Sequence, residues 1–457
     1  METLNNVVLT IQNYMSNYVL IIALLGAGLW FSFRLGFIQV RGFGEGMRRT
    51  FGGLFSKKGE AGADGMSSFQ ALATAIAAQV GTGNIAGAAT ALAIGGAGAI
   101  FWMWIAAFLG MATIYAEALM AQKYKTVGAD GQVTGGPVYY IRAAFKGTFG
   151  KVLAALFAIL ITLALGFMGN AVQSNSIAAA FHTAFGIPQW IMGVVVAVIA
   201  LFVFAGGIER IAKVTETIVP LMAALYIVGA LIVIIYNYKN IPYAFASIFV
   251  GAFAPQSVVG GAAGATVKLA LTKGVARGLF SNEAGMGSTP HAHAVAKVNH
   301  PVEQGFVAMA GVFIDTFIVL NLTALVILTT KSIPTGKTGA ELSQYAFSTL
   351  YGKGGDIFVA ICMFFFAFST IIGWYFFGQA NVKYLFGKNA VKPYAVLVSL
   401  CVLLGSLAQV DLVWNMADCF NSLMVIPNIL ALFFLSSQMK ELHDDYYHNF
   451  LKNKKVK

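Results

Sequence analysis

The sequence has too few charged residues for a protein that faces water on all sides. Charged residues make up 10% of the 457 residues, whereas a soluble domain carries about 25%. Hydrophobic residues reach 58%, and apolar runs of about 20 residues, the length of a membrane helix, recur along the chain. We therefore expect an all-α integral membrane protein in contact with membrane lipid, with no separate soluble domain.

Cysteines and catalytic motifs are scarce as well. The three cysteines, Cys362, Cys401 and Cys419, lie in apolar segments without paired spacing, which argues against a disulfide framework or a zinc site. The sequence contains no G-x-S-x-G, Walker A or H-E-x-x-H motif. An enzyme is therefore poorly supported, ATP-driven transport by this chain alone is not expected, and no cofactor is expected.

Basic residues are missing from the start of the chain, where Arg34 is the first. A signal peptide needs a basic flank before its apolar stretch, so the first apolar span is expected to be a retained helix. The net charge of +11 would suit a nucleic-acid binder, but Lys and Arg cluster in short loops and form no extended basic surface. No nucleic-acid partner is expected.

The apolar runs predict about eleven transmembrane helices. They cover residues 17–38, 69–95, 98–122, 150–180, 188–206, 214–237, 243–267, 303–331, 355–384, 391–408 and 413–437. If the N-terminus is outside, the inner segments hold the Lys and Arg of 41–58, 123–151, 210–213, 268–297, 383–392 and 440–457. The outer segments then hold only Lys239, Lys331, Lys337 and Lys353. The positive-inside rule therefore predicts an outside N-terminus and a cytoplasmic C-terminus.

Two spans are interrupted by clustered glycine. The span 69–95 contains Gly81-Thr82-Gly83-Asn84, and the span 243–267 contains Ala254-Pro255-Gln256 followed by Gly260-Gly261. Because these spans are five apart, they can be the first helices of two five-helix repeats of opposite orientation. A matched pair of broken helices is the best sequence pointer to a transporter binding site. The alternative is that both are flexible spots in ordinary helices.

The first interruption carries polar groups in an apolar span. Gln79, Thr82 and Asn84 need partners in hydrocarbon, and Gly81 and Gly83 allow the helix to unwind. Unwinding frees amides that can hold a carboxylate and carbonyls that can hold a cation. The competing interpretation is a polar contact between helices.

Two further polar groups are candidates for the same site. Ser369 and Thr370 supply hydroxyl oxygens, which suit sodium, and Trp374 follows one turn later on the face of Thr370. The hydroxyls can equally bond back to their own helix, and Trp374 can be a packing residue. Asn170 and Ser174 share a helix face in a polar stripe that also holds Gln173 and Asn175, which suits a zwitterionic substrate or a contact between helices.

Three carboxylates stand within or near spans. Glu117 and Glu216 are expected near inner ends, solvated or paired with loop arginines, whereas Asp315 is nearer the middle of a span and is a candidate for a structural or ion-linked role. Farther along, the polar, Gly-rich stretch 282–288 precedes His291 and His293. Their spacing does not place the two imidazoles on one helix face, so a metal site is not expected there.

Several motifs together resemble the alanine/glycine:cation symporter family. The strongest is Gly95-Gly96-Ala97-Gly98-Ala99-Ile100-Phe101-Trp102-Met103-Trp104, with Gly110 after it. The stretches 81–87, 281–285 and 369–374 look like the same family. The resemblance runs from about Ser68 to Trp374 and beyond.

This resemblance implies sodium-coupled or sometimes proton-coupled import of alanine, glycine or a related neutral amino acid, with glutamine as an alternative substrate. It implies the inverted five-plus-five repeat fold of the bacterial leucine transporter, with span 17–38 as an extra N-terminal helix. The expected parts are an N-terminal helix and loop over 1–66, a transport core over 67–440 with repeats at about 67–238 and 241–440, and a basic tail over 441–457. The expected location is the plasma membrane of a bacterium or archaeon.

The resemblance also implies a set of site residues. Sodium is expected between the carbonyls of Ala77 and Val80 and the hydroxyls of Ser369 and Thr370. The substrate carboxylate is expected near the amides of Thr82 and Gly83. The other expected substrate contacts are Gln79, Asn170, Thr370 and Trp374, with Phe253 and Ser257 as weaker candidates. Passive channel and non-transporting sensor remain the rival classes.

Overall fold

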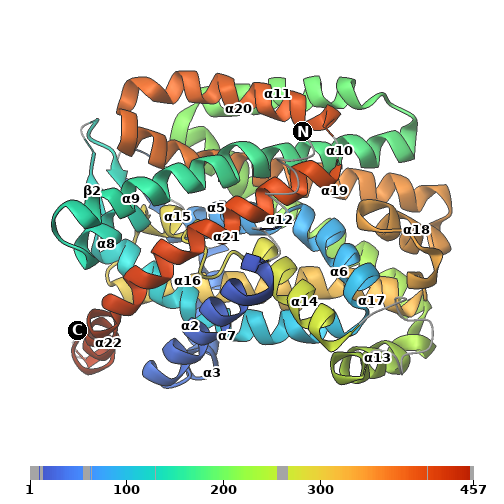
Figure 1. The fold of residues 1–457 in the computed structure, drawn as a ribbon, viewed down its shortest axis with the longest axis horizontal. Helices are drawn as coiled ribbons and strands as arrows, with labels where there is room; N and C mark the ends of the chain where they lie inside the picture. The colour runs from blue at the N-terminus through green and yellow to red at the C-terminus, as the bar shows by residue number, and fades with distance from the viewer. Residues whose placement is uncertain are drawn as a thin grey trace.

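The computed structural model describes residues 14–54, 64–128, 130–254, 266–408 and 410–452, together with Thr10 and Gly62. The described chain is a bundle of helices (Figure 1). In that view, α8, α22 and β2 lie at the left of the bundle and α13 and α18 lie at the right. We call these the α8 end and the α18 end.

The first half of the bundle contains both long and interrupted helices. Its helices are η1 (Met15–Val19), α2 (Leu20–Arg34), α3 (Ile38–Arg41), α4 (Phe43–Leu54), α5 (Ser68–Gln79), η2 (Gly83–Gly87), α6 (Ala88–Gly95), α7 (Gly98–Lys123), α8 (Pro137–Ala144), α9 (Gly147–Ile161), η3 (Thr162–Gly169), α10 (Asn170–Phe185), α11 (Gln189–Ala205), α12 (Gly207–Tyr236) and η4 (Tyr238–Asn240).

The second half begins with a short helix at the α18 end. Its helices are α13 (Ile241–Phe253), α14 (Val267–Asn282), α15 (Pro290–Ala294), α16 (Pro301–Val312), η6 (Phe313–Leu320), α17 (Asn321–Thr329), η7 (Ile333–Thr335), α18 (Gly339–Tyr351), α19 (Lys353–Phe386), η8 (Lys388–Ala390), α20 (Val391–Leu407), α21 (Val410–Phe434), α22 (Ser436–Asp445) and η9 (Tyr446–Phe450).

Within the described ranges, seven helical stretches are long and apolar enough to cross a membrane. They are Gly98–Lys123, Gly147–Phe185, Gly207–Tyr236, Pro301–Thr329, Lys353–Phe386, Lys388–Leu407 and Trp414–Phe434, and each overlaps a span expected from the sequence. Large apolar side chains on their outer faces, such as Ile235 and Leu404, are exposed, as they are where a helix faces lipid rather than water. The chain is therefore a multi-pass membrane protein, while the count of eleven spans stays a prediction.

The two short strand pairs lie between helices and tie loops together. β1 (Met66–Ser67) pairs in parallel with β4 (Ala296–Lys297), and β2 (Thr126–Val127) pairs antiparallel with β3 (Val133–Thr134). Ser67 also begins α5, because its hydroxyl accepts a hydrogen bond from the Gln70 amide while the Gln70 side chain accepts one from the Ser67 amide. The start of α5 and the segment after α15 are thus held next to each other.

The glycine-rich motif at 95–98 is explained by a sharp turn and a close contact. Gly96 has a φ of 73°, a left-handed conformation that glycine adopts without strain. A Cβ atom at Gly98 would overlap the carbonyl of Gly251. The turn from α6 into α7 therefore needs glycine both for its backbone and for contact with α13.

The segment after the second interrupted span differs from expectation. The basic residues of 268–297 were expected in an inner segment between two spans, but Val267–Asn282 forms helix α14, which packs against α7 and α6 inside the bundle. Lys273 and Arg277 of α14 line a cavity together with residues 338–341 at the α18 end. The residues 255–265, which include Ser257 and the expected break, lie outside the described residues.

Phe253, a weaker candidate for a substrate contact, lies away from the first interruption. It ends α13 and is 62% exposed, and its ring packs against Phe101 and Trp102 on the outer side of α7. It therefore has no place in a buried site near the first interruption.

The packing of α14 against α7 can be tested by a substitution at Gly274. A Cβ atom at Gly274 would lie 2.5 Å from the Ala99 carbonyl oxygen and 2.8 Å from the Trp102 Cβ. We expect Gly274→Ala to lower the free energy of unfolding by about 1–3 kcal/mol, because backbone must move to admit the methyl group. Thermal unfolding in detergent measures this.

Gly26→Ala is the matched control, because a Cβ at Gly26 in α2 would meet nothing within 4 Å. Equal melting temperatures for the two variants would contradict the packing of α14 against α7.

Candidate binding site

The first interruption lies in the middle of the bundle, where α5 ends and η2 begins. Val80 leaves the helical conformation with φ −82° and ψ 87°, and residues 80–82 join the two halves. The Gly81 amide donates to Asn84 Oδ1 at 3.0 Å, and the Thr82 amide donates to Gln173 Oε1 at 3.1 Å. Gly81 is required here, because a Cβ atom would overlap Thr370 Oγ1 of α19.

The structure brings the four expected sodium ligands together. Thr370 Oγ1 lies 2.9 Å from the Ala77 carbonyl oxygen and 3.5 Å from the Val80 carbonyl oxygen. Ser369 Oγ lies 3.4 Å from the Ala77 carbonyl oxygen. Each hydroxyl also lies within hydrogen-bond distance of the Phe366 carbonyl, one turn earlier in α19. Two hydroxyls and two carbonyls therefore converge, and such uncharged oxygens are hard ligands for a small cation.

A second unwound segment faces the first one. Helix α14 ends at Asn282, and Glu283 adopts a left-handed conformation with φ 58°. Gln79 Nε2 donates to the Asn282 carbonyl at 2.7 Å, which links the two unwound segments directly. A Cβ atom at Gly83 would lie 3.1 Å from the Ser281 Cα, so the absence of a side chain lets α14 approach closely. The described residues therefore contain a second unwound segment at 283–289.

Asp315 of η6 lies beside both breaks and is fully buried. Its Oδ1 accepts hydrogen bonds from Asn84 Nδ2 at 2.7 Å and from Ser281 Oγ at 3.0 Å. Its Oδ2 accepts from Thr316 Oγ1 at 2.9 Å. All these donors are neutral, and no salt bridge to Asp315 is found among the described residues. This buried position fits the expectation that Asp315 has a structural or ion-linked role in the middle of a span.

Trp374 of α19 is fully buried, and its indole nitrogen contacts a carboxylate. Trp374 Nε1 donates to Glu283 Oε1 at 2.5 Å, and Ser288 Oγ donates to Glu283 Oε2 at 2.5 Å. A Cβ atom at Gly169 would overlap the Trp374 ring, so the tryptophan packs directly on the backbone that leads into α10. Sequence reasoning missed Glu283, although the polar, glycine-rich stretch 282–288 was a visible signal.

Glu117 holds the second unwound segment. Its two carboxylate oxygens accept the amides of Gly285 at 3.0 Å and Gly287 at 2.9 Å, and Asn428 Nδ2 donates to Oε1 at 2.7 Å. The expectation that Glu117 is solvated or paired with loop arginines is wrong, because it is fully buried and its partners are neutral. The carboxylate instead satisfies the backbone amides that unwinding leaves free.

Several buried polar atoms around the first break have no protein hydrogen-bond partner among the described residues. Asn170, Gln173 and Ser174 lie at i, i+3 and i+4, on one face of α10, and the Thr82 amide contacts this face through Gln173. The unpaired atoms are Thr82 Oγ1, Asn170 Oδ1, Gln173 Nε2, Ser174 Oγ and, on the side facing α14, Gln79 Oε1. Unpaired polar atoms inside a protein are costly, so a cluster of them indicates a place for a polar ligand.

The expected site residues thus fall into two groups. Thr82, Asn170, Thr370 and Trp374 belong to the side where α5, α10 and α19 meet. Gln79 instead points toward α14 and α16, where its Oε1 would lie 3.2 Å from a Cβ atom at Gly311. The Gln79 side chain therefore links the two unwound segments through its hydrogen bond to the Asn282 carbonyl.

A cavity of about 650 Å³ lies at the α18 end, between α6, α10, α14, α18 and α21. Arg277 lines it and forms a two-point ion pair with Asp418 of α21 at 2.9 and 3.1 Å. The Arg277 guanidinium also lies 4.5 Å from the Trp414 ring centre. Phe280 packs between Trp414 and Trp374, with ring centres 4.9 and 5.6 Å away. An aromatic layer and an ion pair therefore separate this cavity from Trp374.

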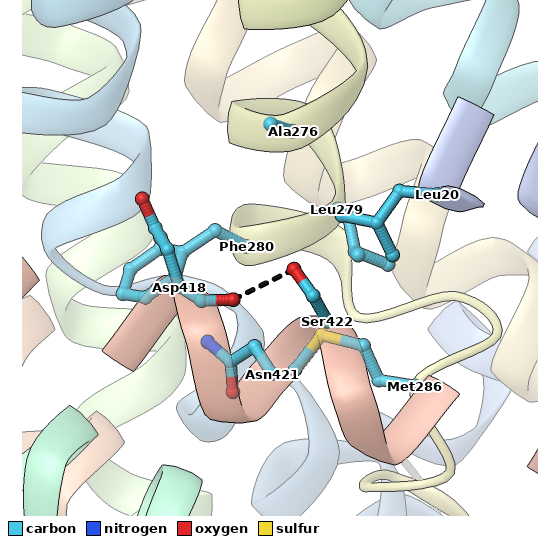
Figure 2. A pocket seen from close by; sticks show the side chains of 8 residues that line it. All are labelled: Leu20, Ala276, Leu279, Phe280, Met286, Asp418, Asn421 and Ser422. Carbon is cyan, nitrogen blue, oxygen red and sulfur yellow. Dashed lines mark hydrogen bonds between the residues drawn. The ribbon is translucent and has the colours of Figure 1, made fainter. Parts of the chain in front are cut away.

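Figure 2 shows side chains of α14 and α21 that line a pocket next to Asp418. Phe280 and Leu279 face Asp418, Asn421 and Ser422 across a small cavity of about 10 Å³. The Ser422 hydroxyl donates to the Asp418 backbone carbonyl at 2.7 Å. Such a volume holds about one water molecule, so little free space remains between these side chains.

Comparison with known proteins gives consistent results. The family model described as the sodium:alanine symporter family matches residues 1–457. The sodium/alanine symporter AgcS of Methanococcus maripaludis is 42% identical over 433 residues, which cover 93% of this chain and 94% of that protein. The probable sodium/glutamine symporter GlnT of Bacillus subtilis is 40% identical over 447 residues, covering 97% and 91%. A manganese transporter of Eremococcus coleocola shares the fold with a TM-score of 0.53 at 14% identity, covering 80% and 76%.

The contacts of Glu117 predict a strong dependence of stability on its charge. In Glu117→Gln, the side-chain amide can face a backbone amide where a carboxylate oxygen now accepts a hydrogen bond. We expect the free energy of unfolding to fall by about 1–3 kcal/mol, the cost of leaving a buried donor unsatisfied. Thermal unfolding in detergent measures this.

Glu341→Gln provides the control, because Glu341 is exposed and pairs only with the nearby Lys337. A shift of the same size in both variants, or none in Glu117→Gln, would argue against the proposed role of Glu117 in holding residues 285–287.

Proposed function

This chain belongs to the sodium:alanine symporter family, and we propose that it imports alanine, glycine or a similarly small neutral amino acid together with sodium. The family consists of transporters rather than enzymes, and sodium-coupled transport of amino acids follows from it. The observation that carries the proposal is the group of unpaired polar atoms on Thr82, Asn170, Gln173 and Ser174 beside two hydroxyls and two carbonyls.

Sodium binds between α5 and α19 in this proposal. The carbonyl oxygens of Ala77 and Val80 are freed where α5 unwinds, and the hydroxyls of Ser369 and Thr370 complete the set. Since one ligand pair is on each helix, a bound cation holds α5 and α19 together. The cation therefore favours the arrangement of the break that presents its amides to the substrate.

The substrate carboxylate binds at the amides of Thr82 and Gly83. Gln173 Oε1 now accepts the Thr82 amide, and a carboxylate oxygen can take this place while the Gln173 side-chain amide turns to donate to it. The substrate amino group lies toward Glu283, whose carboxylate contacts Trp374. Because Glu283 is a buried carboxylate next to Trp374, it disfavours acidic substrates.

Access to the site alternates between the two ends of the bundle. At the α18 end, the ion pair of Arg277 with Asp418 and the rings of Trp414 and Phe280 form the barrier. At the α8 end, the unwound segment 283–289 is held by Glu117. In this proposal, α5 with η2 and α6 and α14 with α15 are the matching broken helices of the inverted five-plus-five repeat within a transport core of residues 67–440.

The charge distribution supports an outside N-terminus and a cytoplasmic C-terminus in a bacterial or archaeal plasma membrane. The α8 end remains the more basic one even after Lys273 and Arg277 are assigned to the α18 end. It holds Arg34, Arg41, Arg49, Lys123, Arg142, Lys383, Lys388 and Lys440. The α18 end then faces outside, and its cavity is the entry for the amino acid.

The sodium site is tested by removing its hydroxyls. We expect the double variant Ser369→Ala with Thr370→Ala to need at least tenfold more sodium for half-maximal alanine uptake, because two of four ligands are lost. Uptake at saturating sodium should change less. Proteoliposomes with labelled alanine and varied sodium measure this, and accumulation against the alanine gradient separates a symporter from a channel or a sensor.

Ser399→Ala serves as the control, since the Ser399 hydroxyl donates to the Ala395 carbonyl within α20, away from the site. An unchanged sodium activation curve in the double variant would place the ion elsewhere. Uptake driven by a pH gradient alone would identify the proton as the coupling ion.

Substrate size is tested at Trp374. We expect the wild type to prefer alanine over glutamine and leucine, because the buried indole leaves little room beyond a methyl group. Trp374→Ala should open space, shift the preference toward larger neutral side chains and weaken alanine binding through lost packing. Competition of alanine, glutamine and leucine against labelled alanine measures the preference.

Trp374→Phe separates the two properties of the indole, because it keeps an aromatic wall and removes the N–H that donates to Glu283. It should retain the preference for alanine. A wild type that already favours glutamine would contradict the small-substrate proposal and support the alternative of a glutamine symporter, to which a relative's name points.

A further inference from the structure

A basic pocket lies at the α8 end, between the end of α2 and the C-terminal helix α22. Its volume is about 440 Å³. It is lined by Phe33, Arg34, Leu35, Gly36, Arg41, Lys440, His443, Asp444, Tyr447 and His448. None of its lining residues belongs to the transport site described above. The proposed transport cycle does not use this pocket.

The turn between α2 and α3 builds one wall of this pocket. Gly36 and Phe37 both have left-handed backbone conformations, with φ 62° and 54°, which reverse the chain after α2. A Cβ atom at Gly36 would lie 2.7 Å from Arg41 Nη1, so the guanidinium of Arg41 folds back over the turn. The absence of a side chain at Gly36 therefore helps to position a cation in the pocket.

The opposite wall is fixed by Arg34. Arg34 Nε donates to the Ser436 carbonyl at 3.2 Å, and Nη2 donates to Ser437 Oγ at 3.0 Å. These contacts join the end of α2 to the start of α22. The two arginines thus come from different helices and face the same pocket.

Positive charge is in excess in this pocket. Its walls hold three cations, Arg34, Arg41 and Lys440, against one carboxylate, Asp444, which pairs with Lys440. No carboxylate pairs with either arginine among the described residues. Burial lowers the pKa of His443 to about 4, so this imidazole is neutral at pH 7, and its Nδ1 lies 2.9 Å from the Tyr115 hydroxyl.

The pocket borders the surface that faces lipid. Trp30 and Phe33 of α2 are 47% and 69% exposed, and Val40 of α3 is 62% exposed. These apolar side chains lie next to the cations at the end of an apolar helix, which is the level of the lipid headgroups. Basic pockets in this position suit phosphate-bearing headgroups.

We propose that this pocket binds the phosphate of an anionic phospholipid such as phosphatidylglycerol, between the guanidinium groups of Arg34 and Arg41. The acyl chains run along the exposed apolar side chains of α2 and α3. The bound headgroup links the end of α2 to α22. This site does not depend on the identity of the transported amino acid or of the coupling ion.

The experiment titrates the full-length protein in detergent with phosphatidylglycerol and counts bound lipid by native mass spectrometry. Wild type should bind phosphatidylglycerol in preference to phosphatidylcholine. Arg41→Gln and Arg34→Gln should each weaken the first binding step about fivefold, which corresponds to the ~1 kcal/mol of one basic residue near an anionic lipid. Arg41 is the cleaner site, because its side chain makes no hydrogen bond that fixes α22 among the described residues.

Arg142→Gln is the matched control, since Arg142 is an exposed arginine of α8 at the same end and does not line the pocket. It should leave the affinity unchanged. Circular dichroism and melting in lipid-free detergent check the fold of each variant, and Arg34→Gln provides the same test if Arg41→Gln does not fold.

Three results would overturn the proposal. One is an unchanged affinity in the pocket variants, and another is an equal loss in Arg142→Gln, which would indicate general attraction to the basic end. The third is displacement of the lipid by millimolar inorganic phosphate, which would make this a site for free anions rather than for a lipid.

Discussion

The unwinding of two helices inside an apolar bundle is the constraint on which the structure depends. Backbone amides and carbonyls that leave a helix in a membrane protein must find partners within the protein, because hydrocarbon offers none. Here Gln173 accepts the Thr82 amide, Gln79 donates to the Asn282 carbonyl, and Glu117 accepts the amides of Gly285 and Gly287. Each of these side chains comes from a helix other than the one whose backbone it satisfies, so the breaks also determine how the helices pack.

The three buried carboxylates near the breaks follow the same principle. Glu117, Glu283 and Asp315 are all fully buried, and each accepts hydrogen bonds from neutral donors. A desolvated carboxylate without such donors would be very costly. The donors are supplied by glycine amides, by an indole and by small polar side chains, which are groups that fit between closely packed helices. The polar network is therefore built into an interior that otherwise consists mainly of alanine and of larger aliphatic and aromatic side chains.

Much of this arrangement could be predicted from the sequence, and the part that could not has a physical cause. The long spans were predicted because their apolar runs are continuous, and the first break was predicted because Gly81 and Gly83 flank a polar residue. Helix α14 was missed because Lys268, Lys273 and Arg277 make it read as a loop, although Arg277 is neutralised by Asp418 across 141 residues of sequence. Glu117 was missed as part of the break because two of its partners are backbone amides, which sequence patterns do not reveal. Glu283 was missed because its hydrogen bond from the Trp374 indole joins residues 91 positions apart.

The position of α14 connects the two ends of the bundle. Its second half carries Arg277, which pairs with Asp418 beside the cavity at the α18 end. Its last residue, Asn282, accepts Gln79 through its carbonyl, and the segment that follows is held by Glu117. Residues 277–282 form less than two turns of helix, about 8 Å at 1.5 Å per residue. Because residues this close together in one helix move as one body, a shift that separates Arg277 from Asp418 must also strain the contact between the two breaks. The last turns of α14 therefore couple the barrier at the α18 end to the geometry of both unwound segments.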